Sequence, residues 1–473
     1  MTSQEFYSLL RFSFPFSPTL KQDTVLKNLS SFILDKSHNK IFLIKGFAGT
    51  GKTTIVGSLV KNLWKIKKSF VLLAPTGRAA KVISNYSSNE AQTIHKKIYT
   101  PRTDKNGKTS FILGINKHKN SIFIVDEASM ISINSSQSNP FGSGDMLNDL
   151  IRYVYSGFKC KILFIGDTAQ LPPIDINLSP ALSADYLELN FNKNVIEFEL
   201  DEVVRQEENS GILLNATSLR ESISLNNLSS FKFNLNKFID ILRLTDGQDI
   251  LDELNNSYSI NGNDETTFIV RSNKRANLYN QQIRSRVLLK DHEISAGDFL
   301  MIVKNNYFWL KPSTEAGFIA NGDIIEILEI YSIKDLYEFR FAEVKIRLVD
   351  YPKMKPLEIV LMLDTILLET ASLSYSDSNK LYQNILLDYQ DEKSSYKKFL
   401  AIKKNKYLNA LQVKFAYAIT CHKSQGGQWN NVFVEKPYLP NGVDENYLRW
   451  LYTAITRAKE KLFLIGFDED SFE

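Results

Sequence analysis

Cysteine and histidine are scarce in this chain of 473 residues. Cys160 and Cys421 are its two cysteines, too few for a disulfide framework, and they suit a reducing cytoplasm. His95 and His422 lie far apart without cysteine partners, so they do not form a zinc-binding pattern. We therefore expect neither structural disulfides nor a zinc site.

Long apolar runs and a large excess of charge are also missing. No apolar stretch of the sequence approaches the ~18 residues that a membrane-spanning helix needs, and the first residues lack the basic and apolar regions of a secretory signal. We expect no membrane contact and a cytoplasmic location. The net charge is only +4, so a nucleic-acid partner must be argued from where the charges lie.

The most specific pattern lies in residues 40–54, KIFLIKGFAGTGKTT. An apolar strand precedes a glycine loop, and periodic apolar residues after the loop predict a helix. The loop fits G-x-x-x-x-G-K-[ST] at each fixed position. Because its backbone N–H groups and the helix N-terminus attract anions, it predicts a site for the phosphates of ATP, with Lys52 on the outer phosphates and the Thr53 hydroxyl on Mg²⁺. The residues expected around the nucleotide are Gly46, Ala48, Gly49, Thr50, Gly51, Lys52, Thr53 and Thr54.

Gln22 precedes this loop at the start of an amphipathic helix. An amide both donates and accepts hydrogen bonds, so Gln22 is a candidate for reading adenine. A solvent-facing helix residue is an equally good interpretation.

Three further apolar segments, 70–74, 121–127 and 161–167, end in polar residues. Strands alternating with helices indicate a parallel sheet covered on both faces, with its ligand beyond the carboxyl ends of the strands. There Asp126 would hold Mg²⁺ through water and Glu127 would polarise the attacking water. Gln170 follows the next strand and could contact the γ-phosphate side and a neighbouring domain, or simply belong to a loop.

Residues 95–120 carry seven Lys/Arg and one acidic residue. Tyr99 and Phe111 flank a turn candidate at 104–107, which predicts a basic β-hairpin. Cations with aromatic rings suit single-stranded nucleic acid. A solvated basic loop remains the alternative.

The α/β pattern starts again at residue 195 and predicts a second domain, with strands at 195–200, 266–270, 414–419, 432–434 and 461–465. The segment 296–410 interrupts it. Its β-branched and aromatic residues and the turn at 320–323 predict a small barrel, with exposed helices at 377–409. The predicted boundaries are 1–97 and 121–195 for the first domain, 98–120 for the hairpin, 196–295 and 411–473 for the second domain, and 296–410 for the barrel.

Two arginines, Arg205 and Arg457, are candidates for contact with the γ-phosphate. An arginine from a second domain would neutralise charge on the phosphoryl group and make hydrolysis depend on domain closure. Either one also fits an ordinary surface arginine, and neighbouring glutamates offer Arg205 salt bridges.

Polar residues at two strand ends are candidates for gripping a phosphodiester backbone without reading bases. Thr420, His422 and Lys423 lie in the second predicted domain, and Thr93 and His95 lie in the first.

The ordered motifs together resemble superfamily 1B DNA helicases of the Dda/RecD type, over nearly the whole chain. The matching segments are Gln22, GFAGTGKT at 46–53, APTGRAAK at 74–81, QTIHK at 92–96, VDEAS at 125–129, GDTAQLPP at 166–173, LDEVVRQ at 200–206, AITCHKSQGGQW at 418–429 and YTAITRAK at 452–459.

The resemblance implies an α/β fold of two RecA-like P-loop domains in tandem, with a small β-hairpin insert in the first and an SH3-like β-barrel insert in the second. It implies ATP-driven, 5′-to-3′ movement along single-stranded DNA by a monomer that unwinds forks. Repair, recombination and replication are the implied settings, with a single-strand-binding protein as a candidate partner. The implied hydrolytic residues are Lys52, Asp126, Glu127, Gln170, Arg205 and Arg457, and the implied DNA contacts are Thr76, Thr93, His95, Thr420 and His422. Tyr99 and Phe111 are candidates for the residue that separates the strands.

Three alternatives stay open. The first is a translocase that displaces proteins with little unwinding. The second is a DNA-binding module with a vestigial nucleotide site. The third is an RNA substrate, because backbone contacts discriminate weakly unless the 2′-hydroxyl is read.

Overall fold

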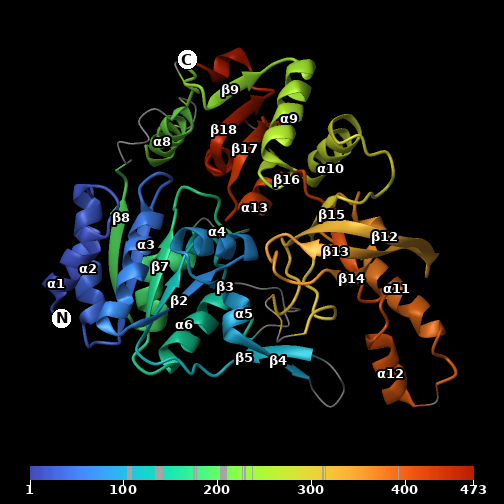
Figure 1. Ribbon diagram of the computed structural model, residues 1–473, viewed down its shortest axis with the longest axis horizontal. Coiled ribbons are helices and arrows are strands. Elements are labelled where there is room, and N and C mark those ends of the chain that lie inside the picture. Colours follow the sequence, from blue (N-terminus) through green and yellow to red (C-terminus); the bar gives the residue numbers. More distant parts are fainter. Residues whose placement is uncertain are drawn as a thin grey trace.

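Two sheets, a β-hairpin and a closed barrel make up the computed structural model (Figure 1). The predicted α/β fold with these inserts is confirmed. The structure describes residues 1–103, 109–133, 142–173, 176, 178–202, 210–225, 227, 231–236, 238–311, 314, 316–392, 394–440 and 442–473. Within these ranges no helix is long and apolar enough to cross a membrane.

The first sheet has six parallel strands in the order β3-β2-β6-β7-β1-β8. They are β1 (Lys40–Gly46), β2 (Ser69–Ala74), β3 (Ala91–Thr93), β6 (Ser121–Val125), β7 (Lys161–Gly166) and β8 (Asn194–Leu200). Helices cover both faces: α1 (Ser3–Phe12), α2 (Leu20–Leu34), α3 (Lys52–Leu63), α4 (Gly77–Ser87), α5 (Ile94–Ile98), α6 (Met146–Ser156) and α7 (Ala184–Phe191). We call this sheet with its helices the first lobe.

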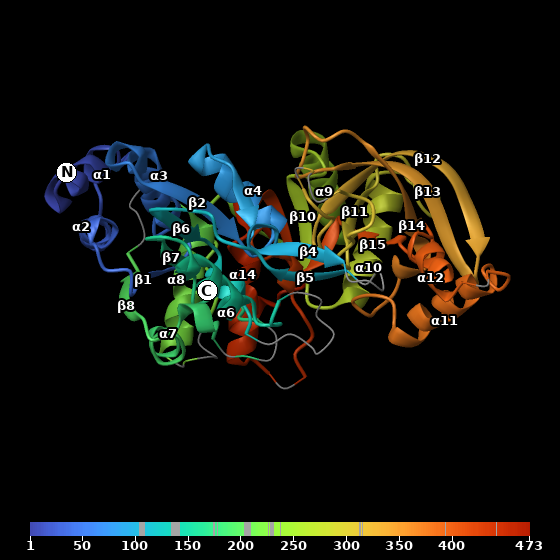
Figure 2. The same cartoon turned by 90° about the horizontal axis from the view of Figure 1, so that it is seen from below.

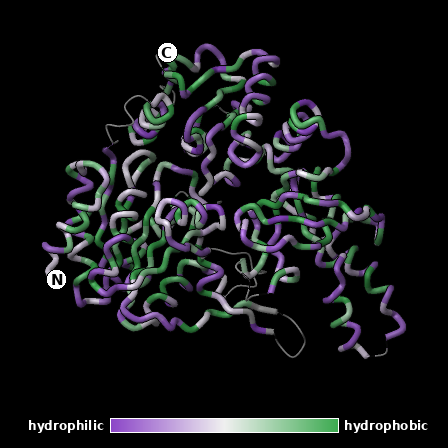
Figure 3. Tube along the Cα trace, in the orientation of Figure 1, coloured by the Kyte–Doolittle hydropathy of each residue, from purple (hydrophilic) through white to green (hydrophobic). Residues whose placement is uncertain are grey.

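Strand β1 shows why the sheet sequences are continuously apolar. Ile41 and Leu43 point into one hydrophobic cluster, whereas Phe42 and Ile44 point into another on the opposite face. A strand buried on both faces needs apolar residues at every position. The Cα trace of Figure 3 shows these hydrophobic strands inside a more hydrophilic periphery.

The assignment of residues 195–200 to the second domain was wrong. Strand β8 pairs in parallel with β1, from Lys40 opposite Asn194 to Gly46 opposite Leu200, and forms an edge of the first sheet. Its apolar run resembles any other buried strand, so the sequence alone does not reveal which sheet it joins.

The second sheet has the order β16-β10-β17-β18-β9 and is also parallel. Its strands are β9 (Ile241–Leu244), β10 (Thr266–Val270), β16 (Ala418–Thr420), β17 (Trp429–Glu435) and β18 (Ala458–Ile465). Its helices are α8 (Gly211–Ser224), α9 (Gly247–Asn261), α10 (Asn273–Gln282), α13 (Cys421–Ser424) and α14 (Glu445–Ile455), and a π-helix, η5, spans Ile283–Val287. This sheet with its helices is the second lobe.

Strand β15 closes the barrel and corrects another boundary. The barrel consists of β11 (Phe299–Ile302), β12 (Ile324–Leu336), β13 (Phe339–Leu348), β14 (Leu357–Met362) and β15 (Leu411–Phe415). The single strand predicted at 414–419 is therefore two, because β15 pairs with β11 and β14 while β16 joins the second sheet. Helices α11 (Tyr375–Leu387) and α12 (Ser395–Lys403) extend from the barrel, as predicted for 377–409 (Figure 1).

The hairpin strands β4 (Tyr99–Thr103) and β5 (Thr109–Leu113) pair antiparallel, as predicted. The predicted turn at 104–107 lies outside the described residues. Figure 2 shows the hairpin reaching from the first lobe toward the barrel. Short 3₁₀ segments lie at Trp64–Ile66, Ala128–Met130, Pro180–Leu182, Leu363–Thr365 and Glu469–Ser471.

Candidate functional site

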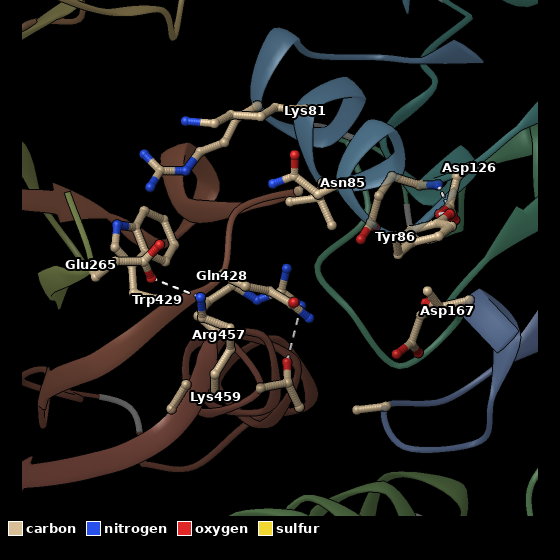
Figure 4. A pocket seen from close by; sticks show the side chains of 18 of the residues that line it. Lys81, Asn85, Tyr86, Asp126, Asp167, Glu265, Gln428, Trp429, Arg457 and Lys459 are labelled. Atoms are coloured by element: carbon tan, nitrogen blue, oxygen red, sulfur yellow. Dashed lines mark hydrogen bonds and ion pairs between the residues drawn. The ribbon is translucent and has the colours of Figure 1, made fainter. Parts of the chain in front are cut away.

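A cavity of ≈ 630 Å³ lies where the two lobes meet. From the first lobe, its lining includes the phosphate loop and residues that follow β6 and β7. From the second, it includes the start of β17 and the end of α14. Figure 4 shows Tyr86, Asp126 and Asp167 facing Gln428, Trp429 and Arg457 across this space.

The phosphate loop has the predicted strand–loop–helix context. Gly51 takes a left-handed conformation (φ 82°) directly before α3, and a Cβ there would lie 2.5 Å from the Gln22 amide nitrogen. Lys52 Nζ donates hydrogen bonds to the carbonyls of Gly46 and Phe47, both at 2.7 Å. The lysine charge is thus held over the loop, where anionic phosphate oxygens would be stronger partners than these neutral carbonyls.

Gln22 is 2% exposed, which excludes the solvent-facing interpretation. Its Nε2 donates to the Thr50 carbonyl at 3.0 Å, and its Oε1 accepts from the Thr19 backbone N–H at 3.0 Å. The amide therefore ties the start of α2 to the phosphate loop. One N–H and one lone pair remain, and adenine contact stays a prediction.

The acidic pair lies at the carboxyl end of β6. Asp126 accepts hydrogen bonds from the Tyr86 hydroxyl and the Glu127 backbone N–H, both at 2.8 Å. Burial raises the pKa of both carboxyls, while the Arg457 charge opposes the rise at Glu127. Glu127 also has a left-handed backbone (φ 52°), uncommon for a non-glycine residue.

These residues fit a magnesium ion bound together with phosphates. Mg²⁺ usually takes one or two carboxylates, waters and phosphate oxygens rather than an all-protein cage. Thr53 and Asp126 line the same cavity, and the described residues contain no cluster of three or more His, Cys, Asp or Glu side chains that could form such a cage. A cation would also offset the cost of burying two neighbouring carboxylates.

Arg457 lines this cavity from the end of α14 and is 3% exposed. Its Nε donates to the Thr453 carbonyl at 2.9 Å, and its Nη1 donates to the Gly427 carbonyl at 3.3 Å. The structure thus brings Arg457 to the same space as Lys52, Asp126 and Glu127. Arg205 lies outside the described residues.

Tyr452, which lies in the motif at 452–459 but was not predicted to have a role, joins the two lobes. Its hydroxyl accepts a hydrogen bond from the Ala48 N–H of the phosphate loop at 2.9 Å and donates one to Asp167 Oδ2 at 2.7 Å. Tyr452 lies on α14 and both partners lie in the first lobe. Its place in the same segment, YTAITRAK at 452–459, five residues before Arg457, was the signal that could have revealed it.

The loop after β7 is held by the second lobe at further points. The Thr453 hydroxyl accepts from the Leu171 N–H at 2.8 Å, and Gln425 Nε2 donates to the Leu171 carbonyl at 2.6 Å. Gln170 lies within this loop and is 6% exposed, and its Oε1 is buried without a hydrogen-bond partner. An unsatisfied buried acceptor is costly, so it is a candidate for a ligand or water contact.

A second contact across the lobes pairs Arg78 with Trp429. The guanidinium carbon lies 4.0 Å from the centre of the indole ring. Such a cation–π contact is favourable when it is shielded from water, and Trp429 is 3% exposed. We had predicted no role for either residue from the sequence.

The proposed DNA contacts of the first lobe lie at helix starts. Thr76 and Thr93 accept hydrogen bonds from the Ala79 and Lys96 N–H groups, both at 3.2 Å, and so cap α4 and α5. Burial lowers the pKa of His95 to about 4, so the imidazole is neutral at neutral pH. Their contact with DNA stays a prediction.

The proposed DNA contacts of the second lobe surround α13. Thr420 precedes this helix, and the following His422 is exposed. Lys423 donates to the Asn321 side chain on the turn before β12, and burial lowers the pKa of Lys423 to about 8. Their contact with DNA is likewise a prediction.

Tyr99 and Phe111 do not form the exposed rings expected on the hairpin. Tyr99 is 6% exposed and donates a hydrogen bond to Asp149 on α6 at 2.8 Å. Phe111 is 9% exposed and lies 4.5 Å, centre to centre, from the Tyr307 ring. Both rings are packed into the protein because they anchor the base of the hairpin, so neither offers a free face to a base.

Comparison with known proteins agrees with this arrangement. Residues 33–228 match a model described as an AAA domain, and residues 415–465 match the UvrD-like helicase C-terminal domain. The ATP-dependent DNA helicase dda of Enterobacteria phage T4 is 26% identical over 467 residues, covering 92% of this chain and 95% of that protein. The uncharacterized protein R530 of Acanthamoeba polyphaga mimivirus is 25% identical, covering 93% and 98%.

A solved structure, the Pif1 helicase from Bacteroides in complex with ADP-AlF3 and ssDNA, aligns with 94% of this chain and 92% of its own at 15% identity and a TM-score of 0.48. The two family matches, the similarity to the phage helicase along nearly the whole chain and the ordered motifs together support the resemblance of this chain to superfamily 1B helicases.

Proposed function

We propose that this chain is an ATP-dependent DNA helicase that moves 5′ to 3′ along single-stranded DNA and unwinds duplex. One observation carries the proposal: Lys52, Asp126 and Glu127 of one lobe share a cavity with Arg457 of the other. A catalytic site divided between two lobes makes hydrolysis depend on their relative position. The similarity to a relative named as an ATP-dependent DNA helicase supports the choice of substrate.

The side chains divide the work of hydrolysis. Lys52 would exchange its carbonyl partners for the outer phosphates, and Thr53 and Asp126 would hold Mg²⁺, which supplies positive charge against the phosphate oxygens. Glu127 would orient and deprotonate the attacking water, and its raised pKa makes it a better base than an exposed carboxylate. Arg457 would neutralise charge on the γ-phosphoryl group.

The contacts around Tyr452 and Gln170 would link the nucleotide to movement. A change at the phosphate loop or at Asp167 reaches α14 through the Tyr452 hydroxyl. Opening and closing of the lobes would then alternate the grip of Thr76, Thr93 and His95 with that of Thr420, His422 and Lys423 on the strand. Since such contacts go to the backbone, binding should have little sequence preference and should weaken with salt. The proposed organisation is two RecA-like domains, now with β8 in the first and β15 in the barrel.

Unwinding of partial duplexes that carry a 5′ or a 3′ single-stranded tail tests activity, direction and substrate together. We expect unwinding of the 5′-tailed substrate only, and only with ATP and Mg²⁺. Lys52→Ala serves as the inactive control. Unwinding of the 3′-tailed substrate alone would refute the direction, and no ATP-dependent unwinding of either would refute the helicase activity.

The burial of Tyr99 and Phe111 favours one rival. Because both rings at the base of the hairpin are buried, neither is available there to separate the strands. A translocase that displaces bound proteins with little unwinding is therefore the second candidate function. A forked duplex assayed beside a strand carrying a tightly bound protein separates the two: a helicase clears both substrates, whereas the rival clears only the protein.

A further inference from the structure

A basic surface lies at the opposite end of the first sheet from the nucleotide cavity. Three segments, 61–70, 114–121 and 156–162, contain eight lysines and no acidic residue. They lead into β2, β6 and β7, which are neighbours in the sheet. The start of each strand therefore lies beside the next, and the three segments meet at the amino ends of the strands, away from the carboxyl ends that carry the site.

Hydrogen bonds lock the three segments together. The Asn120 N–H donates to the Phe158 carbonyl at 2.8 Å, and the Asn120 amide nitrogen donates to the Lys67 carbonyl at 3.4 Å. Lys68 Nζ donates to the Asn120 side-chain oxygen. Burial and the neighbouring Lys159 charge lower the pKa of Lys68. The like charges are thus held close together by a fixed framework rather than by chance proximity of mobile side chains.

Two exposed aromatic rings lie among the lysines. Trp64 is 70% exposed and Phe158 is 62% exposed. Lys65 Nζ lies 6.0 Å from the Trp64 ring centre, and Lys159 Nζ lies 5.2 Å from that of Phe158. We call the exposed set the basal patch: Trp64, Lys65, Lys67, Lys117, Lys119, Phe158 and Lys159.

The backbone of the three segments is left-handed at two lysines of the basal patch and at the neighbouring Asn120. Lys67 and Lys159 have φ of 55° and Asn120 has φ of 52°. The left-handed region favours glycine, and lysine rarely adopts it. Lys67 takes this conformation where it ends the 3₁₀ turn Trp64–Ile66, so the feature that indicates binding is the pair of large apolar rings left in water beside these lysines.

We propose that the basal patch is a second binding site for single-stranded nucleic acid, separate from the track that the two lobes would form. Lysines neutralise phosphates, and each exposed ring offers a face on which an unpaired base can stack. A duplex hides its base faces, so the rings favour a single strand over double-stranded DNA. The patch would hold a part of the strand that lies outside the track, either behind the motor or on the displaced strand.

Binding of oligonucleotides to two matched triple variants tests this. The patch variant is Lys65→Ala/Lys117→Ala/Lys159→Ala, and the control is Lys27→Ala/Lys274→Ala/Lys461→Ala, whose lysines are equally exposed but scattered. Both remove the same charge from surface side chains, and thermal unfolding checks that both stay folded. A third variant, Trp64→Ala/Phe158→Ala, removes the rings.

The assay follows the fluorescence anisotropy of labelled oligothymidylates of two lengths, one too short to leave the track and one several times longer. At low salt, we expect the patch variant to bind the long strand about 10-fold or more weakly than the control does. The two variants should bind the short strand with equal affinity. The slope of log K against log salt for the long strand should fall by about 2, at about 0.7 per lost phosphate contact. The ring variant should bind the long strand about 10-fold or more weakly, since stacking on each of the two rings is worth about 5-fold or more.

Equal binding of the long strand by the patch variant and the control would overturn the proposal. If the patch variant binds a duplex and a single strand more weakly by the same factor, and the ring variant binds both normally, the contact is with the phosphate backbone and is not specific for single strands. Binding of a tryptophan-containing polyglutamate peptide is measured in the same way. If the patch variant loses affinity for this peptide but not for the oligonucleotides, the partner of the basal patch is a protein and the proposal is wrong. The assay needs no ATP hydrolysis, so its result is independent of whether the chain proves to be a helicase.

Discussion

Replacement of Tyr452 by phenylalanine removes one oxygen atom from the junction between the lobes. In the present arrangement the hydroxyl accepts a hydrogen bond from the Ala48 N–H and donates one to the Asp167 carboxylate. Tyr452 is 1% exposed and Asp167 is also 1% exposed, so water cannot easily replace the lost partner. When the lobes separate, both groups reach water. The substitution therefore penalises the closed arrangement and leaves the open one nearly unchanged.

The penalty follows from the cost of unsatisfied buried groups. Each such group costs about 1–3 kcal/mol, so the loss of a partner at two groups destabilises the closed state by about 2–6 kcal/mol relative to the open state. At about 1.4 kcal/mol per factor of ten, the closing equilibrium falls by roughly 30-fold or more. We expect kcat for DNA-stimulated ATP hydrolysis to fall by at least about 10-fold. The KM for ATP should change little, because the phosphate loop itself is intact.

Tyr447→Phe is the matched control. Tyr447 lies on the same helix and is 6% exposed, but it stacks near Trp450 and does not line the cavity. Steady-state hydrolysis with saturating single-stranded DNA compares the two variants, and nucleotide titration reports affinity separately. Equal kcat values for Tyr452→Phe and Tyr447→Phe would refute the role of the hydroxyl as a bridge.

Three other substitutions have defined outcomes. Lys52→Ala should abolish measurable ATP hydrolysis while DNA binding without nucleotide persists; near-normal DNA-stimulated hydrolysis would show that the site is misassigned. Asp323→Asn should remove a pH dependence of stability. Burial raises the pKa of Asp323 to about 7, so the folded wild type holds a proton that the unfolded chain loses above about 4, and stability from this group falls as pH rises from about 4 to 7. Urea unfolding at pH 5 and pH 8 measures this. The same change in the free energy of unfolding between the two pH values in the wild type and in Asp323→Asn would contradict the assignment. Phe111→Ala should lower the free energy of unfolding by about 3 kcal/mol because the ring is 9% exposed against Tyr307; a change below about 0.5 kcal/mol, typical of surface sites, would show that the contact is not formed in solution.

The sequence predicted those parts of the fold that are governed by local patterns. The phosphate loop, the strand before it and the acidic pair after β6 all depend on short spacings, and the structure places them as expected. The basic hairpin and the two helices extending from the barrel were also found where periodicity and composition indicated.

The errors concern partners that lie far apart along the chain. Strand β8 joins the first sheet and β15 joins the barrel because of pairing with β1, β11 and β14, and apolar runs do not encode their neighbours. Gln22 was ambiguous because its burial depends on where the phosphate loop folds back. Tyr452 was missed for a similar reason: its partners are 285 and 404 residues away along the chain.

The division of the catalytic site between the lobes is tested most directly by Arg457→Ala, assayed for ATP binding and for hydrolysis in the same preparation with single-stranded DNA. Arg457 lies between α14 and β18 of the second lobe, whereas the phosphate loop and the acidic pair come from the first lobe. We predict that nucleotide binding stays within about 3-fold of wild type while hydrolysis falls by 10³-fold or more, as for arginines that act on the transferred phosphoryl group. Hydrolysis at the wild-type rate in Arg457→Ala would contradict the account.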